Sequence, residues 1–336
     1  MKRTKPILGL TMGDPAGIGP EICLRALREP SVLKICTPVL FGDAGVLRRL
    51  QKNLNCRVVS IREFERQERV NEPLVVDCGA IDAQRIQPGK ISAACGRAGY
   101  TYIEKAIRTA LAKRIDAIVT APIHKEALHL AGVKFPGHTE IFTALTNAKR
   151  SCMMLYSDKI TVSMITTHVG FSQVPKGISA RRIFDVIELT AEAMQGILRR
   201  SPKLAICGLN PHAGESGLFG NREEERFIMP AVARARKNRI SIKGPLAPDA
   251  AFTHGQRKQF DAIVCLYHDQ GHIPFKMLAF DTGVNVTLGL PIVRTSVDHG
   301  TAFDIAWQGR ASATSLFSAI EVAAGLARPS KKNNRI

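Results

Sequence analysis

The sequence Tyr-His-Asp-Gln-Gly-His-Ile-Pro-Phe-Lys at residues 267–276, followed by Arg-Thr-Ser-Val-Asp-His-Gly-Thr-Ala-Phe-Asp at residues 294–304, decides how this chain is interpreted. Apolar runs at residues 262–266, 284–288 and 292–293 predict strands around and within it. Polar groups that follow buried strands face the crevice where α/β proteins bind ligands. The alternative is a loop-rich surface of solvated charges, but the glycines and prolines favour a fixed backbone. The polar residues are His268, Asp269, His272, Lys276, Asn285, Arg294, Asp298, His299 and Asp304.

Length and composition indicate a globular protein. The 336 residues, 45% of them hydrophobic, can form one large domain or two. No apolar run reaches the roughly 18 residues of a membrane span, and the run after the basic N-terminus is too short for a signal peptide. The eight cysteines include no Cys-x-x-Cys pair, which favours buried thiols in a reducing compartment. We therefore expect a cytoplasmic protein with no membrane partner.

The formal net charge of +18 raises the question of nucleic-acid binding. The basic residues are spread along the chain, and the clusters at residues 48–49, 199–200 and 234–239 lie in or beside predicted amphipathic helices. Such clusters are usually solvated helix faces. We expect no nucleic-acid partner, and a basic field that helps to collect small anionic substrates.

Strands and helices alternate along the chain, which predicts an α/β fold. Residues 63–72 are expected to form an exposed connection and residues 244–249 a rigid turn. Residues 151–156 and 160–166 are expected to pair. Further strands are predicted at residues 6–12, 39–42, 57–61, 74–77, 116–122 and 204–208, and helices at residues 94–114, 179–198, 221–237 and 313–327.

Two loops are candidate ligand-binding sites. Gly-Asp-Pro-Ala-Gly-Ile-Gly-Pro-Glu at residues 13–21 resembles a phosphate loop, but its spacing matches neither G-x-G-x-x-G nor a Walker motif. A tight strand-to-helix turn explains it equally well. His138 and Thr139 lie where a helix is expected to begin, and free backbone N–H groups there favour phosphate or carboxylate. The alternative is an N-cap threonine beside an incidental histidine.

Three histidines each follow an apolar strand: His168, His212 and His268. Neutral imidazoles at equivalent places suit zinc and its transition-metal neighbours. Asp249 and Asp269 are candidates to orient those imidazoles. Ordinary hydrogen-bonded histidines remain the alternative, because no local metal motif is present.

The sequence resembles the 4-hydroxythreonine-4-phosphate dehydrogenase family of vitamin B6 biosynthesis over nearly its whole length. The motifs are Thr-Met-Gly-Asp-Pro-Ala-Gly-Ile-Gly-Pro-Glu at residues 11–21, Phe-Pro-Gly-His-Thr-Glu at 135–140, Gly-Leu-Asn-Pro-His-Ala-Gly-Glu at 208–215, Tyr-His-Asp-Gln-Gly at 267–271, and residues 284–304. The resemblance implies a two-domain α/β/α fold like the isocitrate and isopropylmalate dehydrogenases. It also implies a homodimer with active sites in the interdomain cleft at the dimer interface. The expected domains are residues 1–135 with 303–330, and residues 136–302, before a disordered tail at 331–336.

By position, the resemblance makes His168, His212 and His268 the ligands of a divalent metal, with His268 supplied by the partner subunit. Zinc is expected, with cobalt or magnesium as alternatives. Lys276, Asp249 and Asp269 are candidates to move protons. The expected substrate contacts are His138, Thr139, Lys276, Asn285 and Arg294.

The implied reaction is NAD-dependent oxidation of a 4-phosphorylated 3-hydroxy C4 acid, followed by decarboxylation. The substrate is 4-hydroxy-L-threonine 4-phosphate, giving 3-amino-2-oxopropyl phosphate. In a sister branch it is 4-phospho-D-threonate or 4-phospho-D-erythronate, giving dihydroxyacetone phosphate. His272-Ile-Pro and Phe-Asp-Ile-Ala-Trp at residues 303–307 resemble that branch. The residues alone leave two alternative functions open. One is a metal-dependent hydrolase, and the other is a basic nucleic-acid-binding protein.

Overall fold

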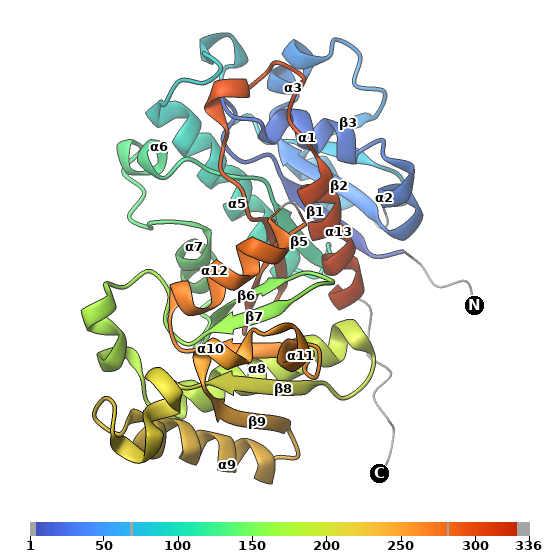
Figure 1. Cartoon of the computed structure of the whole chain (residues 1–336). Helices are drawn as coiled ribbons and strands as arrows, with labels where there is room; N and C mark the ends of the chain where they lie inside the picture. The colour runs from blue at the N-terminus through green and yellow to red at the C-terminus, as the bar shows by residue number, and fades with distance from the viewer. Residues whose placement is uncertain (1–4, 68–69, 281, 328–336) are drawn as a thin grey trace. The chain divides into compact units, whose positions relative to one another are not determined.

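The chain divides into two compact α/β units in a computed structural model that describes residues 5–67, 70–280 and 282–327 (Figure 1). Unit 1 comprises the described parts of Met1–Lys149 and Leu290–Pro329. Unit 2 comprises the described part of Arg150–Gly289. The predicted α/β class is confirmed in both units, and the expected tail at 331–336 lies outside the described residues.

Unit 1 has a parallel sheet in the order β3-β4-β2-β1-β5-β12. Strands covered on both faces read as continuous apolar runs, which is why the sequence signalled most of them. Leu8 and Leu10 of β1, for example, are fully buried. The strands are β1 (Ile7–Thr11), β2 (Thr37–Gly42), β3 (Arg57–Ser60), β4 (Leu74–Asp77), β5 (Ala117–Thr120) and β12 (Val293–Val297).

The helices of unit 1 pack on this sheet. The longest, α5 (Ala93–Leu111), starts at Ser92, whose Oγ accepts a hydrogen bond from the Cys95 N–H at 3.2 Å, and it contacts β1, β2 and β5. α13 (Thr314–Ala327) packs on β12 and β5. The others are α1 (Gly19–Ala26), α2 (Pro30–Ile35), α3 (Ala44–Leu50), α4 (Ile61–Arg66), α6 (Lys125–Leu130), α7 (His138–Leu145) and the short 3₁₀ turns η1 (Ala83–Arg85) and η5 (Phe303–Ile305).

The expected connection at residues 63–72 is wrong in its first part, because α4 continues to Arg66. Ser60 and Glu63 form a capping box: Ser60 Oγ accepts from the Glu63 N–H at 3.2 Å, and the Glu63 carboxylate accepts from the Ser60 N–H at 2.6 Å. Such reciprocal bonds satisfy two N–H groups that a helix start otherwise leaves unpaired. The charged composition of this segment concealed a capped helix.

Unit 2 has a mixed sheet in the order β11-β6-β7-β10-β8-β9. β6 is antiparallel to β11 and β7, as the predicted pairing of residues 151–156 with 160–166 requires, and the remaining pairs are parallel. The predicted turn at 244–249 is wrong: its first part belongs to β9 and its end to α10 (Pro248–Ala251). The strands are β6 (Cys152–Tyr156), β7 (Thr161–Met164), β8 (Lys203–Cys207), β9 (Ser241–Leu246), β10 (Ala262–Cys265) and β11 (Val284–Leu288).

The helices of unit 2 include one that the sequence did not signal. After β10 the chain turns directly into α12 (His268–Ala279), which contacts β7 and β10 and contains Pro274. Proline inside a helix argues against it in a sequence-based prediction. The others are η2 (Phe171–Gly177), α8 (Ala180–Leu198), η3 (Pro211–Gly217), η4, a π-helical turn (Glu224–Ile228), α9 (Met229–Lys237) and α11 (His254–Arg257).

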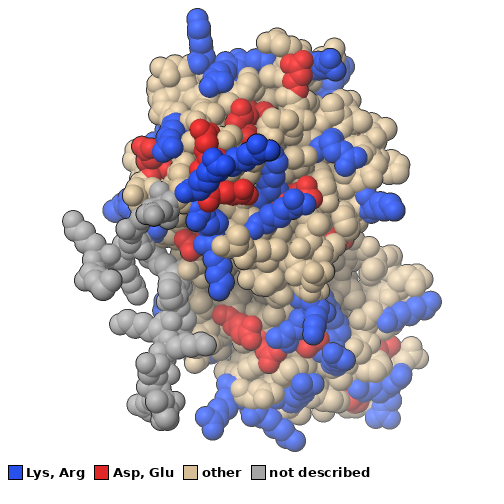
Figure 2. Space-filling model, turned by 180° about the vertical axis from the view of Figure 1, so that it is seen from behind, with Lys and Arg blue, Asp and Glu red and all other residues tan. Residues whose placement is uncertain are grey.

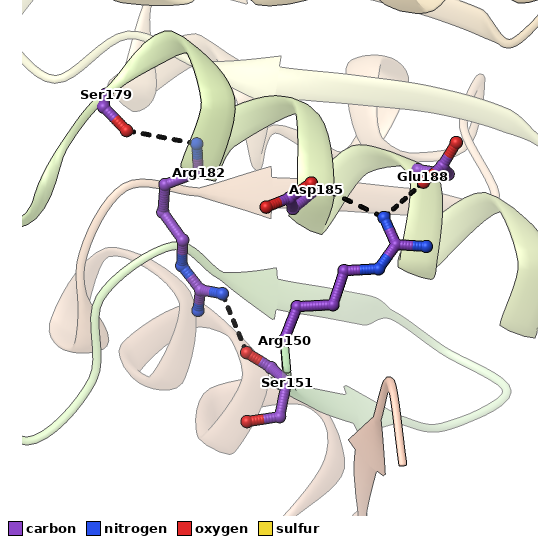
Figure 3. Close-up of polar contacts among 6 residues, drawn as sticks. All are labelled: Arg150, Ser151, Ser179, Arg182, Asp185 and Glu188. Carbon is purple, nitrogen blue, oxygen red and sulfur yellow. Dashed lines mark hydrogen bonds and ion pairs between the residues drawn. The ribbon is translucent and has the colours of Figure 1, made fainter. Parts of the chain in front are cut away.

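Arginine side chains tie α8 to the start of β6 (Figure 3). Ser179 caps α8 by accepting the Arg182 N–H at 3.1 Å, and the Arg182 guanidinium donates to the Ser151 carbonyl at 2.8 Å. Arg150 pairs with the Glu188 carboxylate on the same helix. These bonds, together with the apolar face of α8, hold the long helix on the sheet of unit 2.

The unit boundaries fall at residues 149/150 and 289/290, whereas the sequence placed them at 135/136 and 302/303. α7 belongs to unit 1 because it contacts α5. β12 belongs to unit 1 because it pairs in parallel with β5, with Arg294 opposite Ile118. His138, Thr139 and Arg294 therefore lie in unit 1.

On the face seen in Figure 2, Lys and Arg side chains are interspersed with Asp and Glu and separated by uncharged surface. Across the described ranges, no helix is long and apolar enough to cross a membrane.

Candidate active site

The three predicted metal ligands follow three neighbouring parallel strands. β7, β10 and β8 lie side by side, and the chain reaches His168, His268 and His212 after their respective carboxyl ends. β7 and β10 are fully buried, and β8 is buried except for its first residue, Lys203. The expectation that the histidines occupy equivalent positions is therefore met by the topology.

His168 and His268 come together. Their ring centroids lie 5.7 Å apart, with the planes inclined by 44°. Nδ1 of His268 lies 2.7 Å from Oδ1 of Asp269, and because a carboxylate oxygen accepts, Nδ1 is the donor in this contact. His272, one helical turn further along α12, stacks on the His268 ring at 3.6 Å and 10°. Asp269 and His272 thus fix the orientation of His268.

His212 occupies an unusual loop. Its φ is +53°, and φ stays positive through the next five residues, from Ala213 to Gly217. Left-handed backbone costs about 1–2 kcal/mol for each residue with a Cβ. Strain of this kind persists only where surrounding groups enforce it, and it concentrates at functional sites.

A buried carboxylate supports this loop, and the sequence analysis did not identify it. Glu224 is only 1% exposed, and its Oε1 accepts the N–H groups of Leu209 and Asn210, both at 2.9 Å. Glu223 accepts from the side chain of Asn210 at 3.0 Å. The sequence predicted a helix at residues 221–237, which contains Glu224, but assigned this residue no role. The sequence offered no local signal for this role, because the burial of Glu224 appears only in the folded chain.

The histidines suit a divalent metal. Two imidazoles bound to one zinc ion through nitrogen have ring centres roughly 5–6 Å apart, given Zn–N distances of about 2 Å. The 5.7 Å spacing of His168 and His268 fits this, and so does the Asp269 carboxylate behind His268. Within the described ranges, no three His, Cys, Asp or Glu side chains gather as a ligand set. Within the described part of one chain, His212 therefore does not complete a three-residue set with His168 and His268.

The anion-binding candidates of unit 1 gather around Arg294. This side chain is 2% exposed, its Nη2 donates to Thr120 Oγ1 at 2.8 Å, and its guanidinium lies 5.4 Å from the Phe142 ring centre. Burial lowers the pKa of Arg294 to about 9, and the Glu140 carboxylate opposes that shift. A buried guanidinium that is partly destabilised in this way is a strong site for an anion.

His138 and Thr139 are the first two residues of α7. Burial, and next the positive charge of Arg294, hold the pKa of His138 well below its usual value, so the imidazole is neutral at pH 7. Its Nε2 is buried and makes no hydrogen bond. Gly137 occupies the N-cap position and no side chain caps the helix, so the alternative of an N-cap threonine is wrong. The free helix start and Arg294 together favour an anion.

Three further predicted site residues, Asn285, Lys276 and Asp249, lie in unit 2. Asn285 lies in β11 opposite Leu155, and its Oδ1 is buried without a hydrogen bond. Lys276 is exposed on α12, with Nζ 5.6 Å from the Phe280 ring centre. Asp249 is exposed on α10, a helix that contacts the His212 loop. Both Asn285 and Lys276 belong to unit 2, whereas Arg294 belongs to unit 1.

The glycine-rich loop at residues 13–21 is a structural turn. A Cβ at Gly13 would lie 2.3 Å from the Pro122 carbonyl, and one at Gly19 would lie 2.1 Å from the Met12 carbonyl. All residues of this loop are buried. Its glycines therefore allow backbone to approach backbone, which favours the turn over the ligand loop.

Comparison with known proteins places this α/β chain among dehydrogenases. A solved 4-hydroxythreonine-4-phosphate dehydrogenase from Klebsiella pneumoniae is 40% identical and superposes with a TM-score of 0.84, over 98% of this chain and 100% of that one. The curated D-threonate 4-phosphate dehydrogenase of Cupriavidus necator is 43% identical, over 96% of this chain and 97% of its own. A beta-decarboxylating dehydrogenase from Thermococcus kodakarensis shares the fold alone, at 13% identity, a TM-score of 0.50 and coverage of 94% and 82%.

The family model described as pyridoxal phosphate biosynthetic protein PdxA matches residues 34–323. This chain belongs to that family. The resemblance inferred from the five motifs, and the expected likeness to the decarboxylating dehydrogenases, are confirmed.

Proposed function

We propose that this protein catalyses the NAD- and divalent-metal-dependent oxidation of a 4-phosphorylated 3-hydroxy C4 acid, followed by decarboxylation. The observation that carries the proposal is the His168–His268 pair, with Asp269 at the back of His268, in a chain of this family. It is the arrangement expected of a metal-binding imidazole pair. The buried Arg294 supports a substrate with more than one anionic group.

Each group has a role in this proposal. When bound, the metal supplies a Lewis acid for the C3 oxygen and NAD supplies the hydride acceptor. Arg294, neutral His138 and the start of α7 bind the phosphate or carboxylate. Asp269 holds His268 in one tautomer. We assign Lys276 and Asp249 as candidates to take the hydroxyl proton and to return one after carbon dioxide leaves.

The substituent at C2 separates two versions of the reaction. With an amino group the substrate is 4-hydroxy-L-threonine 4-phosphate, as in the Klebsiella relative's name. With a hydroxyl group at C2 the substrate is 4-phospho-D-threonate or 4-phospho-D-erythronate. The name of the Cupriavidus relative corresponds to 4-phospho-D-threonate. NADH absorbance should be followed with the amino and hydroxyl substrates side by side. Release of inorganic phosphate without NADH would instead favour a metal-dependent hydrolase and reject this proposal.

We further propose a homodimer with shared active sites. α12 begins with His268 and carries Ile273 and Met277, which with Phe280 just after the helix form one apolar stripe; their exposed fractions are 58%, 80% and 70%. An uncovered apolar stripe of this kind marks an interaction surface. A second copy of the chain on α12 would bring its own histidines to the helix that carries His268. That arrangement supports a composite metal site. In such a site a histidine of the second copy would add to the His168–His268 pair, because the described part of one chain has no set of three ligands.

A further inference from the structure

We propose that Glu224 is a positioning residue that fixes the loop carrying His212 in its metal-binding conformation. The inference rests on the proposed metal site and goes beyond it, because Glu224 binds neither metal nor substrate. It acts on the loop backbone of residues 209–214.

The contacts of Glu224 lie at the start of that loop. Its Oε1 accepts the backbone N–H groups of Leu209 and Asn210, each at 2.9 Å, and its Oε2 accepts the Asn210 side-chain amide at 3.1 Å. Two consecutive N–H groups are thereby turned toward one carboxylate. The carboxylate is almost completely buried, so water competes little for these bonds.

The middle of the loop is shaped around the same carboxylate. A Cβ at Gly214 would lie 2.6 Å from Glu224 Oε2, and Gly214 has a φ of +80°. A Cβ at Gly208 would lie 3.2 Å from Oε1 of the same residue. The backbone therefore approaches Glu224 on both sides of His212 at positions where the sequence has no side chain. These close approaches fix the direction in which the His212 Cα–Cβ bond leaves the loop.

The left-handed run makes this support necessary. His212 and Ala213 have φ values of +53° and +54°, which residues with a Cβ adopt only when their surroundings enforce it. Without the Glu224 carboxylate, the N–H groups of Leu209 and Asn210 would lose their acceptor and the loop could relax toward right-handed backbone. His212 would then leave its position although its own chemistry is unchanged.

The test measures Co²⁺ binding to the full-length protein by its visible absorption and by competition with a chelator. Glu224→Gln keeps the size of the side chain and removes its charge. We expect it to weaken Co²⁺ binding by about 10–100-fold, the range typical for residues that orient metal ligands. Glu225→Gln is the matched control: it removes the same charge one residue further, at a carboxylate whose Oε2 makes no hydrogen bond. It should bind Co²⁺ like the wild type.

A double variant separates positioning from general structural support. If Glu224 acts through His212, adding Glu224→Gln to His212→Ala should weaken Co²⁺ binding no further. An equal loss in both backgrounds would show an effect on the fold at large and would overturn the inference. The inference would also be overturned if the Glu224→Gln protein bound Co²⁺ as tightly as the Glu225→Gln protein.

Two further results are decisive. If circular dichroism shows that Glu224→Gln does not fold, Glu224→Asp is measured instead. This variant keeps the charge, but its side chain is one methylene too short to reach both N–H groups, so weaker Co²⁺ binding is again expected. Co²⁺ binding as tight as in the wild type would overturn the inference. Wild-type protein that binds no Co²⁺ would reject the proposed metal site and the inference with it. Wild-type binding together with unaffected variants rejects the role of Glu224 alone.

Discussion

The imidazole rings of His168 and His268 lie 5.7 Å apart, although 100 positions in the sequence separate them. β7 and β10 pair in parallel, with Met164 the last residue of one and Cys265 opposite it on the other. After these strands the two segments of the chain leave the sheet at the same edge, and each supplies a histidine within a few residues. The proposed metal site therefore depends on strand order more than on local sequence.

The first prediction concerns the three histidines. Replacing His168, His212 or His268 by Ala should remove most of the dehydrogenase activity and lower the bound metal, because zinc sites rely on three or four ligands. Metal content and NADH production are measured together. His129→Ala, on exposed α6, is the control and should match the wild type. Full metal content and normal turnover in any of the three variants would remove that residue from the site.

The second prediction tests anion capture by Arg294. Arg294→Lys keeps a positive charge but loses the planar fork that matches phosphate or carboxylate. We expect the KM for the phosphorylated acid to rise at least about tenfold, since a charge-assisted hydrogen bond is worth about 1.5–3 kcal/mol, while the KM for NAD changes little. A thermal melt checks that the buried substitution is folded. A change confined to the NAD constant would assign Arg294 to the cofactor instead.

The third prediction uses subunit exchange to find which chain supplies each ligand. If His168 and His212 come from one chain and His268 from its partner, mixing inactive His168→Ala and His268→Ala proteins creates one intact site per mixed dimer. Random exchange should restore about a quarter of wild-type activity, because half the dimers are mixed and half their sites are intact.

The 5.7 Å pairing of His168 and His268 in one chain suggests a rival version of this experiment. If those two serve the same site and His212 comes from the partner, His168→Ala mixed with His212→Ala recovers activity, whereas His168→Ala mixed with His268→Ala does not. No recovery in any pairwise mixture, with exchange confirmed, would place all three ligands in one chain.

The fourth prediction concerns the dimer surface on α12. Met277→Asp places a charge in the middle of the exposed apolar stripe, and burying an unpaired carboxylate at an interface is strongly unfavourable. We expect a monomer by light scattering, with loss of activity if the sites are shared. Leu130→Asp on α6, at another exposed apolar position, in unit 1, is the control and should leave the mass unchanged. A dimeric Met277→Asp protein would exclude this face.

The fifth prediction concerns pH and Asp14. Burial raises the pKa of Asp14 from 3.8 to about 6, although the Ala16 N–H and His124 oppose the shift. The folded chain therefore binds this proton more tightly than the unfolded chain, so its contribution to stability is present below pH 4 and is lost as the pH rises through 6. The difference amounts to about 3 kcal/mol at pH 7.

Asp14→Asn cannot ionise and should flatten this part of the pH dependence, so that it gains on the wild type between pH 4 and pH 7. Its amide oxygen can still accept the Ala16 N–H that Asp14 Oδ1 accepts at 2.9 Å. Urea unfolding at pH 4, 5, 6 and 7 measures the difference. Parallel curves for the two proteins would show that Asp14 is charged in the folded state at pH 4 already.

The sequence by itself determined the α/β class and the family, and it singled out the three candidate histidines. Buried parallel strands are continuous apolar runs, so β1, β5 and β10 are visible locally, and so is the polar residue that follows each. The periodicity of α5 and α8 is equally local. Motifs such as Tyr-His-Asp-Gln-Gly keep their meaning without coordinates because their residue types carry the chemistry.

Only the tertiary structure decided which of these residues meet. Strand order brings His168 to His268, while β12 and α7 place Arg294 and His138 together in unit 1. α12 was hidden by Pro274, and the left-handed loop at His212 has no helical or strand periodicity. The role of Glu224 depends on backbone N–H groups 14 and 15 residues away. Such contacts are set by how strands and loops pack, a non-local property that the spacing of side-chain types along the chain does not encode.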